Sequence, residues 1–183
     1  SVNGEEESLS TVLPLVKKYG AAVVGLTLDK GGIPTSADKR FDIAKRILDI
    51  ALSLGIPREN IYIDCLTLTA SAEQAGVMET LKALKRVKDE LGLKTVLGVS
   101  NISFGLPNRE LINQSFLTMA LAYGLDLPII NPNVASMTGA VRSYKLLSNI
   151  DKNSTEFINS YNGENKPKPT TSLKSDIDIF YAI

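Results

Sequence analysis

The sequence predicts an α/β fold in which short parallel strands alternate with helices. Four glycines, Gly20, Gly55, Gly92 and Gly124, recur at intervals of 32 to 37 residues, a spacing typical of one supersecondary unit used repeatedly. Each glycine ends a helical pattern and precedes a short apolar run rich in β-branched residues. Runs with so little polar alternation are typical of strands buried on both faces of a parallel sheet.

The elements follow one another as a helix and then four strand–helix pairs, which favours right-handed crossovers between parallel strands. We expect strands at 21–28, 56–63, 93–99 and 125–130, and helices at 5–19, 37–54, 75–91, 108–123 and 134–147. The helix at 37–54 has one apolar stripe, made of Phe41, Ala44, Ile47, Leu48 and Ala51. The helix at 5–19 begins with glutamates and ends with lysines, as suits the helix dipole, and we expect it to bend at Pro14.

Two architectures fit this alternation. One is an open, doubly wound sheet, and the other is part of a (β/α)8 barrel. A complete barrel usually needs about 250 residues, whereas this chain has 183 residues and shows four strand–helix pairs. The pattern alone therefore leaves the choice open.

The composition excludes several kinds of protein. The chain has 20 Lys+Arg and 20 Asp+Glu, so it lacks the basic excess of a nucleic-acid-binding protein. It has no His and one Cys, which excludes His-based triads, metal sites built on His or on several Cys, and an intrachain disulfide. No apolar run approaches the ~18 residues of a membrane span and no signal peptide is recognisable. We therefore expect a cytoplasmic protein, or a piece of one.

Polar side chains recur just beyond the predicted strands. Asp29, Asp64, Asn101 and Asn133 each lie nine residues after one of the four glycines. Because the carboxyl ends of parallel strands meet at one edge, where sites form in both candidate architectures, we expect these groups to converge there. Asp29 also suits an ordinary turn and Asn133 a helix cap, and we favour those roles for these two.

Asp64 and Asn101 carry the stronger signals. Asp64 lies within an apolar run, where a carboxylate needs a ligand or a strong local donor. Asn101 belongs to segment 98–105, in which small residues let a flat ligand approach the backbone and a carboxamide both donates and accepts. This set suits a neutral, nitrogen-rich heterocycle, with Arg109 just beyond it. We expect Cys65 to be a small buried residue rather than a nucleophile, because no base is evident nearby.

Several segments resemble the family of pterin-binding methyltransferases, which includes the folate-binding module of cobalamin-dependent methionine synthase and the methyltetrahydrofolate:corrinoid methyltransferases. The matching segments are Ser-Val-Asn-Gly-Glu at 1–5, Gly-Leu-Thr-Leu-Asp at 25–29, Ile-Tyr-Ile-Asp at 61–64 and Gly-Val-Ser-Asn-Ile-Ser at 98–103. They match in order and spacing, and segment 104–110 favours the methionine synthase branch. The family fold is a (β/α)8 TIM barrel. The resemblance therefore implies the C-terminal half of such a barrel, about four βα units, beginning at the end of the fourth strand.

The resemblance also organises the chain into parts. Residues 1–150 are expected to form the partial pterin-binding barrel, and 151–161 a short helical extension. Residues 162–174 are rich in Gly, Pro and polar side chains, which is typical of a linker. Residues 175–183 are expected to begin the helical cap of a cobalamin region. Because a half-barrel leaves two sheet edges open, we also expect self-association.

The resemblance implies that the substrate is 5-methyltetrahydrofolate, whose pterin ring lies in the barrel mouth. Asp64 is expected to hold the amino-pyrimidine edge of the pterin through two hydrogen bonds. Asn101 is expected to be catalytic, with its amide bonded to the N5 nitrogen as that nitrogen becomes a leaving group. Gly98 and Ser100 are expected to line the ring, and Arg109 to steady the folate. The methyl group then passes to cob(I)alamin and to homocysteine, each on another module, and this chain ligates no metal.

The sequence departs from the family pattern in places. The second pterin-binding Asp belongs to an earlier strand, the Asn expected just before Ser1 is missing, and Cys65 stands where a Pro is expected. Half of the pocket is therefore missing, and we expect the isolated chain to be inactive. Two alternatives remain: a non-catalytic half-barrel that only self-associates, and an enzyme similar to dihydropteroate synthase. The latter needs an anion site for pyrophosphate, and no Lys/Arg cluster marks the strand ends.

Overall fold

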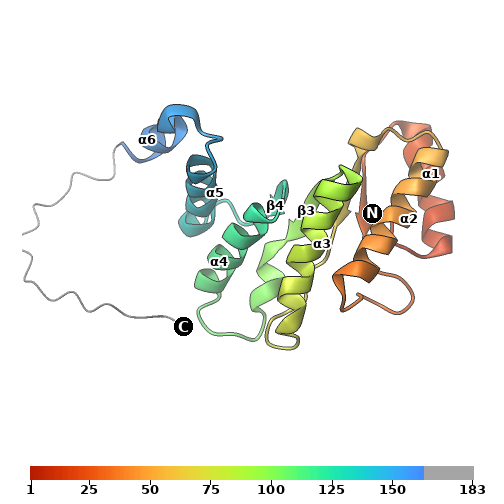
Figure 1. Ribbon diagram of the computed structural model, residues 1–183, viewed down its shortest axis with the longest axis horizontal. Coiled ribbons are helices and arrows are strands. Elements are labelled where there is room, and N and C mark those ends of the chain that lie inside the picture. The colour runs from red at the N-terminus through yellow and green to blue at the C-terminus, as the bar shows by residue number, and fades with distance from the viewer. Residues whose placement is uncertain (163–183) are drawn as a thin grey trace, which may run out of the picture.

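A computed structural model describes residues 1–162, which form one parallel sheet flanked by helices (Figure 1). The elements are α1 (Glu6–Tyr19), β1 (Val23–Leu26), α2 (Ala37–Ser53), η1 (Arg58–Asn60), β2 (Ile61–Asp64), α3 (Ala75–Leu91), β3 (Lys94–Gly98), η2 (Val99–Ser103), α4 (Arg109–Ala122), β4 (Leu127–Ile129), α5 (Ala135–Leu147), η3 (Lys152–Ser154) and α6 (Thr155–Tyr161). The strand order is β1-β2-β3-β4, and all neighbouring strands are parallel. The predicted α/β alternation is confirmed.

The spaced glycines end the helices, as their positions predict. Gly20 and Gly92 cap α1 and α3 in the left-handed conformation, each with a φ of 62°. Gly55 and Gly124 also have positive φ, at 73° and 100°, just after α2 and α4. A residue with a Cβ is strained in this conformation, so glycine at these points releases the chain from each helix toward the next strand.

Strand β2 begins later than the sequence predicts. The apolar run starts at Ile56, but Pro57 has no N–H to donate to a ladder and instead opens the turn η1. Helix α1 continues through Pro14 to Tyr19. At the other end of the described residues, α6 falls within the segment 151–161. The predicted linker and cobalamin-region cap lie outside the described residues, apart from Asn162.

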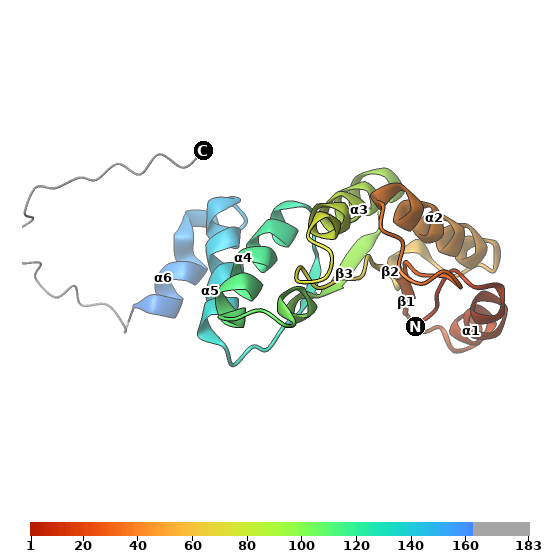
Figure 2. The ribbon, with the colours of Figure 1, turned by 90° about the horizontal axis from the view of Figure 1, so that it is seen from below.

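The two faces of the sheet have different surroundings. Ile63, Thr95 and Leu97 point to the helices and are fully buried, and the core between sheet and helices includes buried residues of α1 to α5. The alternate strand residues form the opposite face, where Leu127 and Ile129 of β4 are 45% and 60% exposed. Figure 2 shows the helices as an outer arc along the sheet. This is the arrangement of a partial (β/α)8 barrel, in which the helix-free face of the sheet turns inward.

Val2 extends the sheet beyond β1. Its N–H donates to the carbonyl of Val24 at 2.9 Å, and the N–H of Leu26 donates to the Val2 carbonyl at 2.7 Å. Val2 thereby forms a parallel bridge with Gly25 and is buried. The residues before α1 therefore occupy the position of a further strand next to β1.

Candidate functional site

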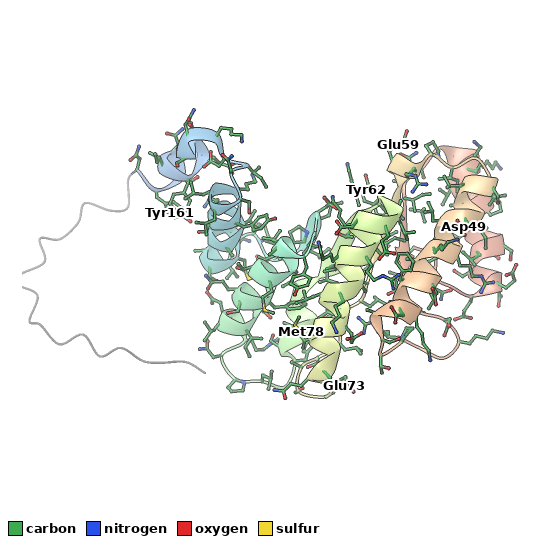
Figure 3. All side chains as sticks on the ribbon, in the orientation of Figure 1. Asp49, Glu59, Tyr62, Glu73, Met78 and Tyr161 are labelled. Atoms are coloured by element: carbon green, nitrogen blue, oxygen red, sulfur yellow. The ribbon has the colours of Figure 1, made fainter. Side chains whose placement is uncertain are left out.

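The carboxyl ends of the strands define one edge of the sheet. In Figure 3, Glu59, just before β2, lies at the opposite end of the sheet from Glu73, in the loop that follows β2. Asp64 ends β2 and Asn101 follows β3 within η2, so both belong to the same edge as Glu73. Parallel α/β folds place their ligands at this edge.

Asp64 is held in a defined turn at this edge. Its ladder partners are Leu26 and Val96, and it is only 9% exposed. Its Oδ1 accepts a hydrogen bond of 2.8 Å from the N–H of Leu66. Leu66 has a φ of 59°, a left-handed conformation that costs a non-glycine residue roughly 1–2 kcal/mol. The local donor that the sequence requires for Asp64 is therefore the backbone of Leu66.

Burial controls proton affinity in this turn. Desolvation raises the pKa of Asp64, and the N–H of Leu66 offsets part of that rise. Cys65 is completely buried, and its burial, together with the neighbouring Asp64 charge, raises the pKa of its thiol well above the ordinary value. A thiol that stays protonated is a poor nucleophile. The prediction that Cys65 is a small buried residue is confirmed.

Asn101 lies on the exposed side of η2, beside Gly98. A Cβ built on Gly98 would lie 3.6 Å from Nδ2 of Asn101, an ordinary contact distance, so the amide group is next to bare backbone. Gly98 pairs with Ile129 and belongs to the same sheet face as Asp64, by the alternation of strand residues. A flat ligand on this face would meet no side chain at Gly98.

Hydrogen bonds join the loop after β2 to the loop after β3. The hydroxyl groups of Thr69 and Ser71 donate to the carbonyl of Phe104, at 2.7 and 2.8 Å. The N–H of Ala70 donates to the carbonyl of Ile102 at 2.9 Å. The segments that carry Asp64 and Asn101 are therefore fixed relative to each other. These contacts use backbone carbonyls as acceptors, so no residue pattern in the sequence predicts them.

Arg109 fastens the loop that contains Asn101. Its Nε donates to Oγ of Ser103 and its Nη2 to the carbonyl of Ser100, each at 3.0 Å. Its guanidinium carbon also lies 4.5 Å from the centre of the Phe104 ring. Ser100 and Arg109 line a pocket of about 330 Å³ together with residues of α4, α5 and the loop between β4 and α5. Two of the donor groups of Arg109 are thus already used within the protein.

The other two strand-end residues serve turns. Oδ1 of Asp29 accepts from the N–H of Gly31 at 2.8 Å, which confirms the predicted turn role. The predicted capping role of Asn133 is wrong, because α5 begins one residue later at a Val134 cap that has no side-chain hydrogen bond. Instead, the N–H of Asn133 donates to Oδ1 of Asn131 at 3.0 Å. Of the four spaced residues, Asp64 and Asn101 remain as site candidates.

Arg40, which our sequence analysis missed, is buried next to the Asp64 turn. It is 0% exposed, its Nη1 lies 3.1 Å from the carbonyl oxygens of both Cys65 and Leu66, and its Nε donates to Pro34. Burial lowers the pKa of Arg40. The sequence did hold a signal, because Arg40 precedes Phe41 on the apolar stripe of α2, and a charge there needs partners.

Two features are absent from residues 1–162. No group of three or more His, Cys, Asp or Glu side chains is placed to hold a metal ion in this part of the chain. No helix within the same residues combines the length and the apolar character that crossing a membrane requires.

Comparison with known proteins identifies the family. A family model described as pterin binding enzyme matches residues 1–131. The chain belongs to this pterin-binding family. Because the family fold is a TIM barrel, the four-stranded sheet is part of such a barrel, as the family resemblance implies. The matched residues include Asp64, Gly98, Asn101 and Arg109 at the strand-end edge.

Three similar curated proteins are a methyltransferase and two methionine synthases. The chain is 29% identical over 146 residues to the methylcorrinoid:tetrahydrofolate methyltransferase of Eubacterium limosum, covering 77% of this chain and 53% of that protein. It is 36% identical over 137 residues to the methionine synthases of Mycobacterium leprae and Mycobacterium tuberculosis, covering 70% of this chain and 11% and 12% of those proteins. The chain thus spans about half the length of the first relative and a small part of the others.

Proposed function

We propose that this chain is the C-terminal half of the pterin-binding barrel of a longer, cytoplasmic enzyme. The enzyme would transfer the methyl group of 5-methyltetrahydrofolate to cob(I)alamin in methionine synthesis. The observation that carries the proposal is the Asp64 carboxylate, which Leu66 holds at the ligand-binding edge of a pterin-family sheet. The likeness to a methylcorrinoid:tetrahydrofolate methyltransferase and to two methionine synthases supports the methyl-transfer chemistry.

Asp64 binds the amino-pyrimidine edge of the pterin. An ionised carboxylate has about four acceptor positions, and the N–H of Leu66 uses one of them. Both oxygens can therefore accept from two adjacent N–H groups of the ring, as a charge-assisted pair. Since burial makes the ionised state of Asp64 costly, the donors of a bound ring would stabilise that charge.

Asn101 assists departure of the methyl group from the folate. Its carboxamide donates to the N5 nitrogen, which is a poor leaving group unless hydrogen-bond donation accompanies bond breaking. A donor fixed in advance contributes about 10²–10³ in rate in comparable sites. Gly98 leaves its backbone open to the ring, and Ser100 lines the ring. Arg109 steadies the folate beside the loop that it fastens through Ser100 and Ser103.

We assign the corrinoid, which supplies the nucleophile that accepts the methyl group, to another module of the enzyme. The donor set of this chain does not fit a metal centre of its own, because the chain has no His and Cys65 is buried with a raised thiol pKa. Homocysteine, the final methyl acceptor, is likewise assigned to a separate module. The residues of this chain therefore act on the folate alone.

Substitution of Asn101 tests the proposal in the full-length enzyme. Asn101→Ala should slow methyl transfer by about 10²-fold or more. Its unfolding free energy should change by less than about 0.5 kcal/mol, because Asn101 is exposed. Asn133→Ala is the matched control, since Asn133 is also an exposed strand-end Asn and should leave the rate unchanged. A normal single-turnover rate in Asn101→Ala would contradict the assignment.

A non-catalytic, self-associating half-barrel is the second candidate function. The observation that favours it is the exposure of Leu127 and Ile129 on β4, the edge strand of the described sheet. An enzyme similar to dihydropteroate synthase has no comparable support. It would need a positive site for pyrophosphate, and two donor groups of Arg109 are engaged by Ser100 and Ser103.

A further inference from the structure

We propose that Arg40 is a positioning residue, which fixes the Asp64 carboxylate by holding the backbone of Leu66 from behind. Only the consequence for folate binding rests on the function proposed above. The geometric part concerns the Leu66 peptide groups, which contact the Arg40 guanidinium on one side and the Asp64 carboxylate on the other.

Both the N–H and the carbonyl group of Leu66 form hydrogen bonds to side chains. Its N–H donates to Oδ1 of Asp64 at 2.8 Å, and its carbonyl oxygen lies 3.1 Å from Nη1 of Arg40. The same Nη1 lies 3.1 Å from the carbonyl of Cys65. A leucine with a φ of 59° persists only where its surroundings over-determine the backbone. The contacts of Arg40 provide that constraint, and the left-handed turn in turn aims the Leu66 N–H at Asp64.

Thr80 on α3 completes the support. Its Oγ1 lies 2.6 Å from Nη1 of Arg40 and 3.3 Å from the Leu66 carbonyl, and it also contacts the Gly76 carbonyl. Arg40 comes from α2 and Thr80 from α3, so two helices converge on one carbonyl behind the strand end. Both side chains are buried, which excludes water as a competing partner for these donors.

The effect of Arg40 on Asp64 runs through backbone geometry more than through charge. The shift in the pKa of Asp64 comes from burial and from the Leu66 N–H. The charged and titratable groups around this turn are the Cys65 thiol, Arg40 from α2, Glu79 from α3 and, two residues toward the amino ends of β2 and β3, Tyr62 and Lys94. If Leu66 leaves its turn, Asp64 loses the hydrogen bond that favours its ionised form, and its pKa rises further.

The titration of the Asp64 side-chain carbon, followed by NMR in the 183-residue chain, tests the geometric part. In Arg40→Met we expect the Asp64 titration to move upward by about half a unit or more, and Arg40→Lys to restore most of it, because lysine keeps a donor. Thr80→Val removes a support without changing any charge, so it should move the titration in the same direction. If Arg40→Met fails to fold, Thr80→Val alone tests the positioning role.

Arg46→Met is the matched control on the same helix. Arg46 bonds to the Gly4 carbonyl and to Glu6, away from the Asp64 turn, so its loss should leave the Asp64 titration unchanged. An unchanged Asp64 titration in the folded Arg40 or Thr80 variants would overturn the positioning role. The positioning role would also be overturned if Arg46→Met moved the Asp64 titration as much as Arg40→Met does.

Folate affinity in the full-length enzyme separates this inference from the proposed function. Arg40→Met should raise the dissociation constant for 5-methyltetrahydrofolate about tenfold or more, with Arg40→Lys intermediate and Arg46→Met unchanged. If the unsubstituted enzyme does not bind this folate, the proposed function fails, and the NMR titration still decides the role of Arg40. If it binds and Arg40→Met binds equally well, the positioning role fails alone.

Discussion

The backbone N–H of Leu66 points at Oδ1 of Asp64 across a single intervening residue, at 2.8 Å, while Leu66 itself occupies the left-handed region of backbone space. The strand therefore ends in a strained turn that serves the carboxylate. Strain of this kind, of order 1–3 kcal/mol, concentrates at sites where a side chain must be held in place before a ligand arrives. A buried carboxylate in such a turn lowers the stability of the fold but can accept hydrogen bonds from a ligand.

Replacing Asp64 by Asn should separate stability from binding. Asn keeps an oxygen for the Leu66 N–H but removes a buried charge, so Asp64→Asn should unfold at higher denaturant concentration than the unsubstituted chain at neutral pH. In the full-length enzyme the same change should weaken folate binding by about 10²-fold, because one acceptor becomes a donor. Asp29→Asn is the control, since Asp29 is an exposed turn residue.

The stability difference between Asp64→Asn and the unsubstituted chain should depend on pH. Burial raises the pKa of folded Asp64 above 3.8, so the folded state holds this proton more tightly than the unfolded state. The unsubstituted chain therefore loses stability as pH rises from about 3.8 to the raised value, by about 1.4 kcal/mol for each unit between them. Asp64→Asn lacks this loss. The stability gap measured by denaturant unfolding should open over that window and stay level above it, and a gap independent of pH would contradict the assignment.

Local patterns predicted the helices and the strand-end edge well. Helix α3 is found at its predicted bounds and α2 within one residue of them, because apolar stripes and left-handed glycines are set by neighbours in sequence. The sequence distinguishes Asp64, a site candidate, from Asp29, a turn residue, because the apolar residues around Asp64 make an unpartnered carboxylate costly. The same local reasoning distinguished a buried Cys65 from a reactive one.

Contacts between distant segments were not predictable in this way. Leu66, with its positive φ, contacts Arg40, which lies 26 residues earlier and reaches it only after α2 packs on the sheet. The hydrogen bonds of Thr69 and Ser71 to the Phe104 carbonyl likewise require two loops to meet. Asn133 was misplaced because Asn131 forms the turn before α5 and moves the helix start by one residue.

The isolated chain should bind folate weakly or not at all. Its sheet offers one acidic and one amide side chain to the ring, whereas ligand pockets bury most of the surface of a bound molecule. Isothermal titration of 5-methyltetrahydrofolate into the 183-residue chain should show no saturable heat at micromolar protein, while the full-length enzyme should bind. A low-micromolar dissociation constant for the chain alone would contradict this prediction.

The chain should self-associate through its open sheet. Ile129 is 60% exposed on β4, and edge strands with exposed apolar side chains pair readily with other chains. Sedimentation velocity at micromolar concentration should show dimers or larger species, and Ile129→Lys should shift them toward monomer. Leu52→Lys, on the outer helix α2, removes a similar side chain away from this edge and should have little effect. A compact monomer of the unsubstituted chain would contradict this prediction.

Alanine at Gly98 tests whether the ring lies against the strand end. A Cβ there would lie 3.6 Å from Asn101, an ordinary distance, and Gly98 has a φ of −75°, so Gly98→Ala should change the unfolding free energy by less than about 1 kcal/mol. The added methyl group would occupy the space of a flat ring, so folate affinity in the full-length enzyme should fall about tenfold or more. Gly25→Ala gives the opposite pattern, because its Cβ would lie 3.0 Å from Ile47 and Ile63 in the core and should destabilise the fold. If Gly98→Ala binds folate normally, the ring does not lie on this face.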